Sequence, residues 1–226
     1  MDASIWPFAA LRITTPRLEL RYPDDDDLVA LAHAAAAGIH DAESMPFFVP
    51  WTRTESPELE RNCLQHGWLR RSSLTRDDWS LPFAVCIDGE PIGVQDVFAK
   101  QFAVRRTAET GSWLTQRAQG AGVGTEMRAA ALHLVFAGLA ADEAHSGSFV
   151  DNPASDAVSR HNGYEANGEE ILEREGEPAR LQHWVLTRAK WAPTGATTSR
   201  SRGSTPVCPS SRSAVAPWST TSWSNW

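Results

Sequence analysis

Hydrophobic and polar positions divide the first 191 residues into short strands and helices. Apolar and charged residues alternate strictly over 17–21, which is typical of a half-buried strand within 11–21. Four consecutive aspartates at 24–27 precede an apolar run that ends at Gly38, and we interpret them as a helix cap and first turn rather than a metal site. Serine, proline and glutamate at 56–58 predict the start of a second helix in the same way.

The centre of the chain is typical of a β-hairpin followed by a crossover. Two β-rich runs flank the dipeptide Asp88-Gly89, which is a strong hairpin signal. The order of these elements predicts an α+β fold with a mixed sheet. The predicted elements are strands over 81–87, 92–98, 107–115 and 144–150, a helix over 123–139, a short helix from a cap at Asn152 to His161, and two extended runs within 164–191.

Composition narrows the class of protein. The chain has 226 residues, 42% of them hydrophobic, and carries a net charge of −7, which disfavours a general grip on nucleic-acid phosphates. Its 3 cysteines form no CxxC pair, so we expect neither a zinc site nor a disulfide framework. No apolar run is long enough to cross a membrane, and the N-terminus does not resemble a signal peptide. We therefore expect a cytoplasmic protein that binds neither nucleic acid nor membrane.

The composition changes after Trp191. Residues 192–226 are rich in serine, threonine and proline and contain no aspartate, glutamate or lysine. Such a segment has little apolar material to offset the entropy of ordering it. We predict one folded domain over 1–191 and a disordered tail over 192–226.

Three glycines, Gly120, Gly122 and Gly124, lie where a predicted strand is followed by the start of a predicted helix. Free amides at a helix start, together with the helix dipole, favour an anion, most often a phosphate. A P-loop is disfavoured because no lysine follows Gly124, and a dinucleotide fold because the glycines lie in mid-chain, after a hairpin. From the glycines alone, a structural turn without a ligand remains open.

Two motifs together resemble those of the GNAT acyltransferase superfamily. Gln119-x-x-Gly122-x-Gly124 followed by Thr-Glu is similar to that family's acyl-CoA pyrophosphate motif. Further along, Asn152-Pro-Ala-Ser155, ending in Gly163-Tyr164, resembles its second motif. The opening Thr-Pro-Arg-Leu-Glu-Leu-Arg at 15–21 resembles the branch that includes the ribosomal-protein alanine N-acetyltransferases. The resemblance spans about 11–190.

This resemblance implies a mixed, centrally splayed sheet with helices on both faces, and acetyl-CoA or another acyl-CoA as co-substrate, without a metal. It further implies that the glycine amides bind the pyrophosphate, while the end of the strand and the second motif hold the pantetheine arm. The implied donor-binding residues are Trp113, Leu114, Thr115, Gln119, Gly120, Ala121, Gly122, Val123, Gly124, Thr125, Asn152 and Ser155.

The implied reaction is direct attack of an amine on the thioester, which calls for a base. By resemblance we expect Glu109 to be that base, with Asp96 and His145 as weaker candidates. Many family members protonate the thiolate with a tyrosine, but the matching position here is Ser159, which becomes the candidate acid. Tyr164 stands at the family's Gly-aromatic position, where we expect it to pack.

The acceptor is expected to be a small amine or a protein N-terminus, beside a wall formed by the apolar loop at 45–51; the same aromatics could equally be ordinary core. A succinyl-CoA-type donor is an alternative, with Arg105 and Arg106 as candidate partners for its carboxylate. A non-catalytic acyl-CoA-binding regulator is another. Dimers are common among family members, so a homodimer is compatible with the resemblance.

Overall fold

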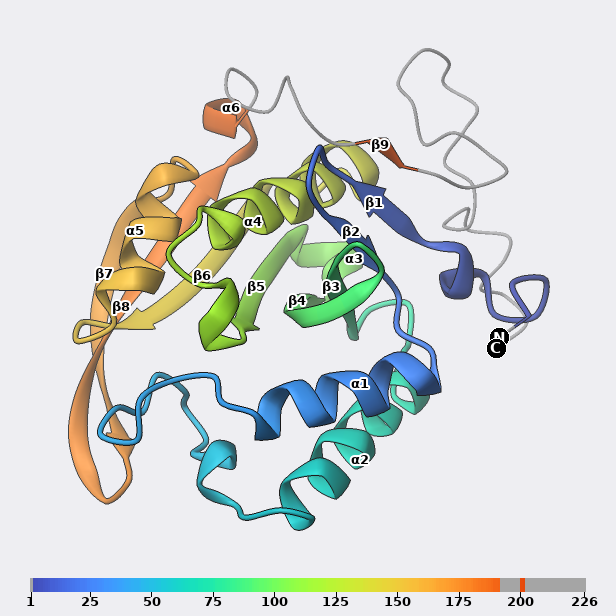
Figure 1. Cartoon of the computed structure of the whole chain (residues 1–226). Coiled ribbons are helices and arrows are strands. Elements are labelled where there is room, and N and C mark those ends of the chain that lie inside the picture. Colours follow the sequence, from blue (N-terminus) through green and yellow to red (C-terminus); the bar gives the residue numbers. More distant parts are fainter. Residues whose placement is uncertain (1, 192–199, 202–226) are drawn as a thin grey trace.

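The computed structural model describes residues 2–191 and 200–201, and its elements follow the predicted order (Figure 1). The helices are α1 (Asp25–Ala36), α2 (Glu58–Ser72), α3 (Phe102–Arg105), α4 (Val123–His133), α5 (Pro153–His161) and α6 (Arg188–Trp191), with one π-helical turn (Leu134–Gly138) extending α4. The strands are β1 (Arg12–Thr14), β2 (Glu19–Arg21), β3 (Trp79–Ile87), β4 (Glu90–Ala99), β5 (Thr107–Leu114), β6 (Glu143–Phe149), β7 (Glu165–Arg174), β8 (Glu177–Thr187) and β9 (Arg200–Ser201).

The strands form one mixed sheet in the order β7-β8-β6-β5-β4-β3-β2-β1-β9. Neighbours are antiparallel except β5 and β6, which are parallel and joined through α4. In Figure 1, α4 and α5 lie on one face of this sheet, and α1 and α2 on the other. The predicted α+β fold with helices on both faces of a mixed sheet is therefore confirmed.

The sheet opens between β5 and β6. These strands pair only from Thr107↔Glu143 to Glu109↔His145, and then diverge. At the fork, side chains replace the missing ladder: Thr110 Oγ1 donates to the carbonyl of His145 at 3.1 Å, and Ser146 Oγ donates to the carbonyl of Thr110 at 3.2 Å. The predicted central splay is present.

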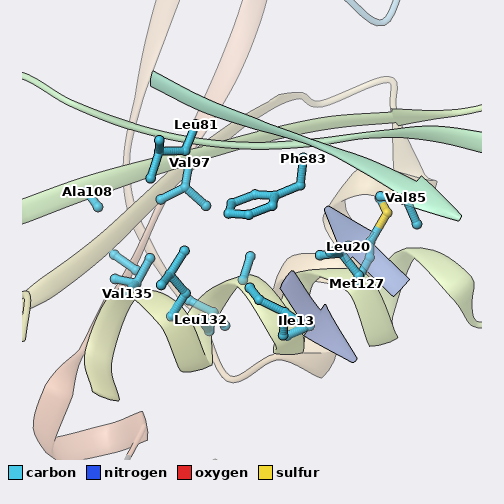
Figure 2. Packing of buried hydrophobic residues seen from close by; sticks show 14 of the residues in the cluster. Ile13, Leu20, Leu81, Phe83, Val85, Val97, Ala108, Met127, Leu132 and Val135 are labelled. Atoms are coloured by element: carbon cyan, nitrogen blue, oxygen red, sulfur yellow. The ribbon is translucent and has the colours of Figure 1, made fainter. Parts of the chain in front are cut away.

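The main core lies between α4 and the sheet. Figure 2 shows Leu81, Phe83 and Val97 from the sheet meeting Leu132 and Val135 from the α4 side. The five side chains are each no more than 1% exposed. Removing such side chains from water is the dominant favourable contribution to folding. This core holds α4, and with it the glycine loop, against the open part of the sheet.

A half-buried strand was predicted within 11–21, from the alternation over 17–21, and the structure has two short strands there, β1 and β2. The chain turns between them, where the Thr15 N–H donates to the carbonyl of Leu18 at 2.9 Å. Pro16 explains the break, because it has no N–H for a ladder and its ring fixes φ. The predicted hairpin is confirmed, with Asp88 at φ 49° and Gly89 at φ 84°, as its two-residue turn requires.

The first helix begins as predicted. The Asp24 carboxylate accepts from the Asp27 N–H at 2.9 Å, and Asp27 accepts from the Asp24 N–H at 3.3 Å, which forms a capping box. The second helix is present, but Ser56 is not its cap, since its hydroxyl donates to Glu60 Oε1 at 2.8 Å instead.

The predicted tail over 192–226 lies outside the described residues, except for Arg200 and Ser201, which pair as β9 with β1. Trp191, the last residue of α6, is also the last described residue before the gap at 192–199, so the boundary predicted there stays a prediction. In the part of the chain that the structure describes, no helix is both long and apolar enough to cross a membrane.

Candidate active site

A cleft of about 660 Å³ opens where β5 and β6 separate. Its walls are the second half of β5, the glycine loop and first turns of α4, the start of α5, and the loop around residues 39–48. These segments are distant in the sequence, and the fork in the sheet brings them together.

The glycine loop leaves backbone amides free at one end of the cleft. Gly120 and Gly122 have φ of 75° and 76°, which other residues adopt only with strain. Gly122 is the N-cap of α4 and supplies no side-chain hydrogen bond, and the first amide bonded to it within the helix is that of Glu126. The amides of Val123, Gly124 and Thr125 are therefore available to an anion.

Gly124 has a second role. A Cβ there would lie 3.2 Å from Cγ2 of Val158 on α5. The absence of a side chain lets the two helices that border the cleft approach each other closely. This requirement holds with or without a ligand.

Two predicted donor-binding residues brace this loop. The Gln119 side-chain amide donates to the carbonyls of Ile39 and Leu114, at 2.7 and 2.9 Å. The carbonyl of Ala121 accepts from Arg17 Nη1 at 3.0 Å. The Gln119 side chain therefore ties the loop to the end of β5 and to the opposite wall.

Sequence reasoning missed what Arg17 does. Besides holding Ala121, Arg17 Nε donates to Glu126 Oε2 at 2.6 Å, and Thr15 Oγ1 donates to Glu126 Oε1 at 2.5 Å. Burial opposes ionisation of Glu126, but the hydrogen bonds from Thr15 and Arg17 outweigh it and lower the pKa of this carboxyl. The motif at 15–21 thus positions the glycine loop through α4, a link that no local sequence signal reveals.

The free edge of β5 presents alternate residues to the cleft. The Thr115 N–H donates to the carbonyl of Ile92 at 2.9 Å, so the backbone of Thr115, and by alternation that of Trp113, points toward β4. The amides of Ser112 and Leu114 point the other way, into the cleft. The backbones of Trp113 and Thr115 were expected to face the donor, and this expectation is corrected. The amides that face the cleft are those of Ser112 and Leu114.

Asn152 and Ser155 both line the cleft on the side of α5. Asn152 Oδ1 accepts from the Ser155 N–H at 3.1 Å and caps the helix as predicted. The cap fixes the orientation of this amide side chain on the cleft wall.

The two predicted catalytic residues lie outside the lining of the cleft. Glu109 is exposed on β5, directly opposite His145 on β6, at the last pair before the strands separate. His145 Nε2 lies 2.9 Å from Glu143 Oε2. Ser159 on α5 is 0% exposed, and its hydroxyl has no partner among the described residues. Their roles stay predictions.

Asp96 lies on β4 opposite Gly111 of β5, and Gly111 lines the cleft. Ser80 Oγ donates to it, with distances of 2.9 and 3.0 Å to the two carboxyl oxygens. Burial raises the pKa of Asp96 to about 6, while the hydrogen bond from Ser80 opposes the shift.

Within residues 2–191 and 200–201, no group of three or more His, Cys, Asp or Glu side chains is placed to hold a metal ion.

Arg128 was also missed by sequence reasoning. This residue of α4 is 2% exposed and lines the cleft. A signal was present: α4 and its π-helical extension are almost entirely apolar beyond Glu126, so a charge within them is expected to be buried. Arg105 and Arg106, in contrast, do not line the cleft, and Arg106 donates to the carbonyl of Leu139 at 2.9 Å.

The apolar loop at 45–51 is part core and part wall. Met45 is 5% exposed and Phe48 54% exposed, and both line the cleft. Arg174 holds the loop by donating to the carbonyl of Met45 at 3.0 Å, and its guanidinium also pairs with Asp151 at 2.6 Å. The loop is thus anchored to the hairpin of β7 and β8.

Comparison with known proteins agrees with this geometry. The model of the acetyltransferase (GNAT) domain family matches residues 17–165. Similar solved structures include RimL, a ribosomal L7/L12 alpha-N-protein acetyltransferase in complex with coenzyme A, at 20% identity, covering 76% of this chain and 95% of that one with a TM-score of 0.59. Mycobacterium smegmatis RimJ, in complex with a CoA disulfide, shares 20% identity over 83% of this chain and 88% of that one, with a TM-score of 0.61.

The spermidine/spermine N-acetyltransferase SpeG of Vibrio cholerae, in mutant form, shares 15% identity over 79% of this chain and 98% of that one, with a TM-score of 0.61. At these identities the structural likeness shows a common fold, whereas the family match covers more than half of the chain and includes both the glycine loop and Asn152. The chain therefore belongs to the GNAT acetyltransferase family and is an acyltransferase.

Proposed function

We propose that this protein transfers an acetyl or other short acyl group from acyl-CoA to a primary amine. The observation that carries the proposal is the joining of two features in one cleft. Free amides at the start of α4 suit a pyrophosphate, and the outward amides of Ser112 and Leu114 suit an extended amide-bearing chain that enters the fork.

The donor's parts match these positions in order. The amides of Gly120 to Thr125 bind the pyrophosphate, those of Ser112 and Leu114 bind the pantetheine arm, and Asn152 and Ser155 contact that arm from the opposite wall. An outward amide of β5 also polarises the thioester carbonyl, since a fixed N–H stabilises the negative charge that develops on that oxygen.

In the reaction, the amine nitrogen attacks the thioester carbon. A C–N bond forms, the C–S bond breaks, and the thiolate leaves and takes up a proton, which gives an amide and CoA thiol. The amine must first be neutral. Glu109 is the base that we propose, because it lies opposite His145 at the closed end of the fork, where β5 and β6 begin to separate. Asp96 is the second candidate.

A protein N-terminus is the acceptor that the cleft favours. RimL is described as an alpha-N-protein acetyltransferase and SpeG as a spermidine/spermine N-acetyltransferase. A polyamine calls for several free carboxylates. Here the two acids of the cleft lining already have partners: Asp41 accepts from Gln116 at 2.9 Å, and Asp151 pairs with Arg174. The exposed Phe48 offers apolar contact to a peptide.

The test combines donor binding with acceptor screening. Calorimetry measures the affinity for CoA, and thiol release from acyl-CoA measures transfer to N-terminal peptides and to spermidine. We expect micromolar CoA binding and transfer to a peptide. Binding without transfer to any amine would favour a non-catalytic regulator, and no detectable binding of CoA would refute the proposal. Cytoplasmic location and a homodimer stay predictions.

A further inference from the structure

Arg128 is a buried cation without a counter-charge. Its Nε donates to Gln95 Oε1 at 3.3 Å, Nη1 to Ser146 Oγ at 3.1 Å and Nη2 to Ser112 Oγ at 3.2 Å. These three acceptors are neutral, and so is the hydroxyl of Tyr164, which also hydrogen-bonds with Arg128; no carboxylate of the described residues pairs with Arg128. Buried charges in proteins are normally paired, because leaving water without a partner is unfavourable.

The guanidinium also has donors to spare. It carries five N–H groups for these four neutral contacts, and its bonds to Gln95, Ser146 and Ser112 are at the long end of the usual range. A carboxylate accepts two parallel hydrogen bonds from such a group and forms stronger, charge-assisted bonds than a hydroxyl does. The side chain is therefore suited to an anion that the protein itself does not supply.

The position of Arg128 suggests where that anion belongs. Ser112 lies on β5 and Ser146 on β6, so the guanidinium spans the two strands whose separation opens the cleft. Arg128 is the only lysine or arginine among the described residues that line the cleft. It lies about 7 to 8 Å along the helix axis from Val123, beyond the amides that suit a pyrophosphate.

We propose that Arg128 binds a carboxylate at the far end of the acyl group, so that the preferred donor is the CoA thioester of a dicarboxylic acid, such as succinyl-CoA. This inference rests on the proposed function, since it names the donor of the same transfer. Arg105 and Arg106, the residues that the sequence suggested for this role, are not in the cleft.

With such a donor, the same bonds form and break as in the transfer described above. The amine nitrogen bonds to the thioester carbon, the C–S bond breaks, and the thiolate leaves and is protonated. The distal carboxylate is unchanged and stays on Arg128 during the transfer. The product is an amide that carries a free carboxylate, so an acceptor that enters with one positive charge leaves with one negative charge.

The experiment compares succinyl-CoA with butyryl-CoA, which has the same number of acyl carbons and a methyl group in place of the carboxylate. Acetyl-CoA and free CoA complete the panel. Calorimetry gives Kd and thiol release gives kcat/KM, for the wild type and for Arg128→Met and Arg128→Lys. We expect the wild type to favour succinyl-CoA over butyryl-CoA by about 10- to 100-fold, in line with hydrogen bonds between charged groups.

In Arg128→Met this preference should vanish or reverse, while the affinity for free CoA stays within about 2-fold because the pyrophosphate amides are untouched. Arg128→Lys keeps the charge but loses the bidentate geometry, so it should restore part of the preference. Circular dichroism and thermal unfolding check that each variant is folded. If Arg128→Met does not fold, the inference is tested by the preference for succinyl-CoA over butyryl-CoA in the wild type and in Arg128→Lys.

Equal use of both donors by the wild type, or a preference for acetyl-CoA, would overturn the inference and leave the proposed function standing. So would an equal loss of affinity for free CoA and succinyl-CoA in Arg128→Met, because the guanidinium would then serve the CoA portion or the fold. Failure to bind CoA or any thioester would instead refute the proposed function itself.

Discussion

Replacing Asp96 with asparagine should stabilise the protein, and the gain should depend on pH. Asp96 lies on β4, and its carboxyl accepts from Ser80. Burial raises the pKa of this group from 3.8 to about 6. The ionised form is therefore unfavourable in the folded state, and an amide of the same shape avoids that penalty.

The magnitude follows from linkage. Below about pH 3 the carboxyl is protonated in both states and has no effect on stability. As pH rises toward 6 the unfolded chain ionises first, so stability is lost, and above about pH 7 the loss is constant at about 3 kcal/mol. The asparagine keeps an oxygen for Ser80 but leaves its NH₂ group poorly paired, which lowers the net gain to about 2 kcal/mol.

Urea unfolding of wild type and Asp96→Asn, at pH 7.5 and pH 5, measures this effect. We expect the variant to gain about 2 kcal/mol at pH 7.5, and about 1.4 kcal/mol less at pH 5. Glu55→Gln, which removes an exposed loop carboxylate, controls for the change in net charge. A gain that is the same at both pH values would refute the reasoning, because it would not come from the ionisation of Asp96. Turnover of the same variant tests whether Asp96 is the base.

Three further predictions address the site. Gly122→Asp should weaken CoA binding by at least about 10-fold relative to Gly122→Asn. Both side chains can cap α4, but only the carboxylate repels a pyrophosphate. Calorimetry at two salt concentrations measures the difference in affinity for CoA. Glu109→Gln should lower kcat by about 100-fold or more and flatten the acidic limb of the pH–rate profile while CoA affinity is retained, and an unchanged profile would exclude Glu109 as the base. Ser159→Ala should raise the free energy of unfolding by about 1 kcal/mol, since its buried hydroxyl has no partner among the described residues, and a shift in the alkaline limb would restore it as the acid.

The fold was predictable where the signals are local. The Asp88-Gly89 turn, the caps at Asp24 and Asn152, and the glycines before α4 each involve residues only a few positions apart, and the structure agrees with all of them. The separation of β1 from β2 within 11–21 was not predicted, because alternation cannot show where a strand folds back on itself. Which amides of β5 face the cleft was also beyond the sequence, because that depends on the ladder phase with β4.

The burial of Arg128 could be predicted from the sequence, but its neighbours could not. Because α4 and its π-helical extension are almost entirely apolar beyond Glu126, the amino-acid pattern by itself favours a buried position for the one arginine within α4. The neighbours of that arginine do not follow from the pattern. Gln95 comes from β4, Ser112 from β5 and Ser146 from β6, and they meet the guanidinium only because the sheet opens at Glu109. The fork that makes room for a thioester therefore also gives this cation its place, and a charge kept buried there is most simply explained by a donor that brings the opposite charge.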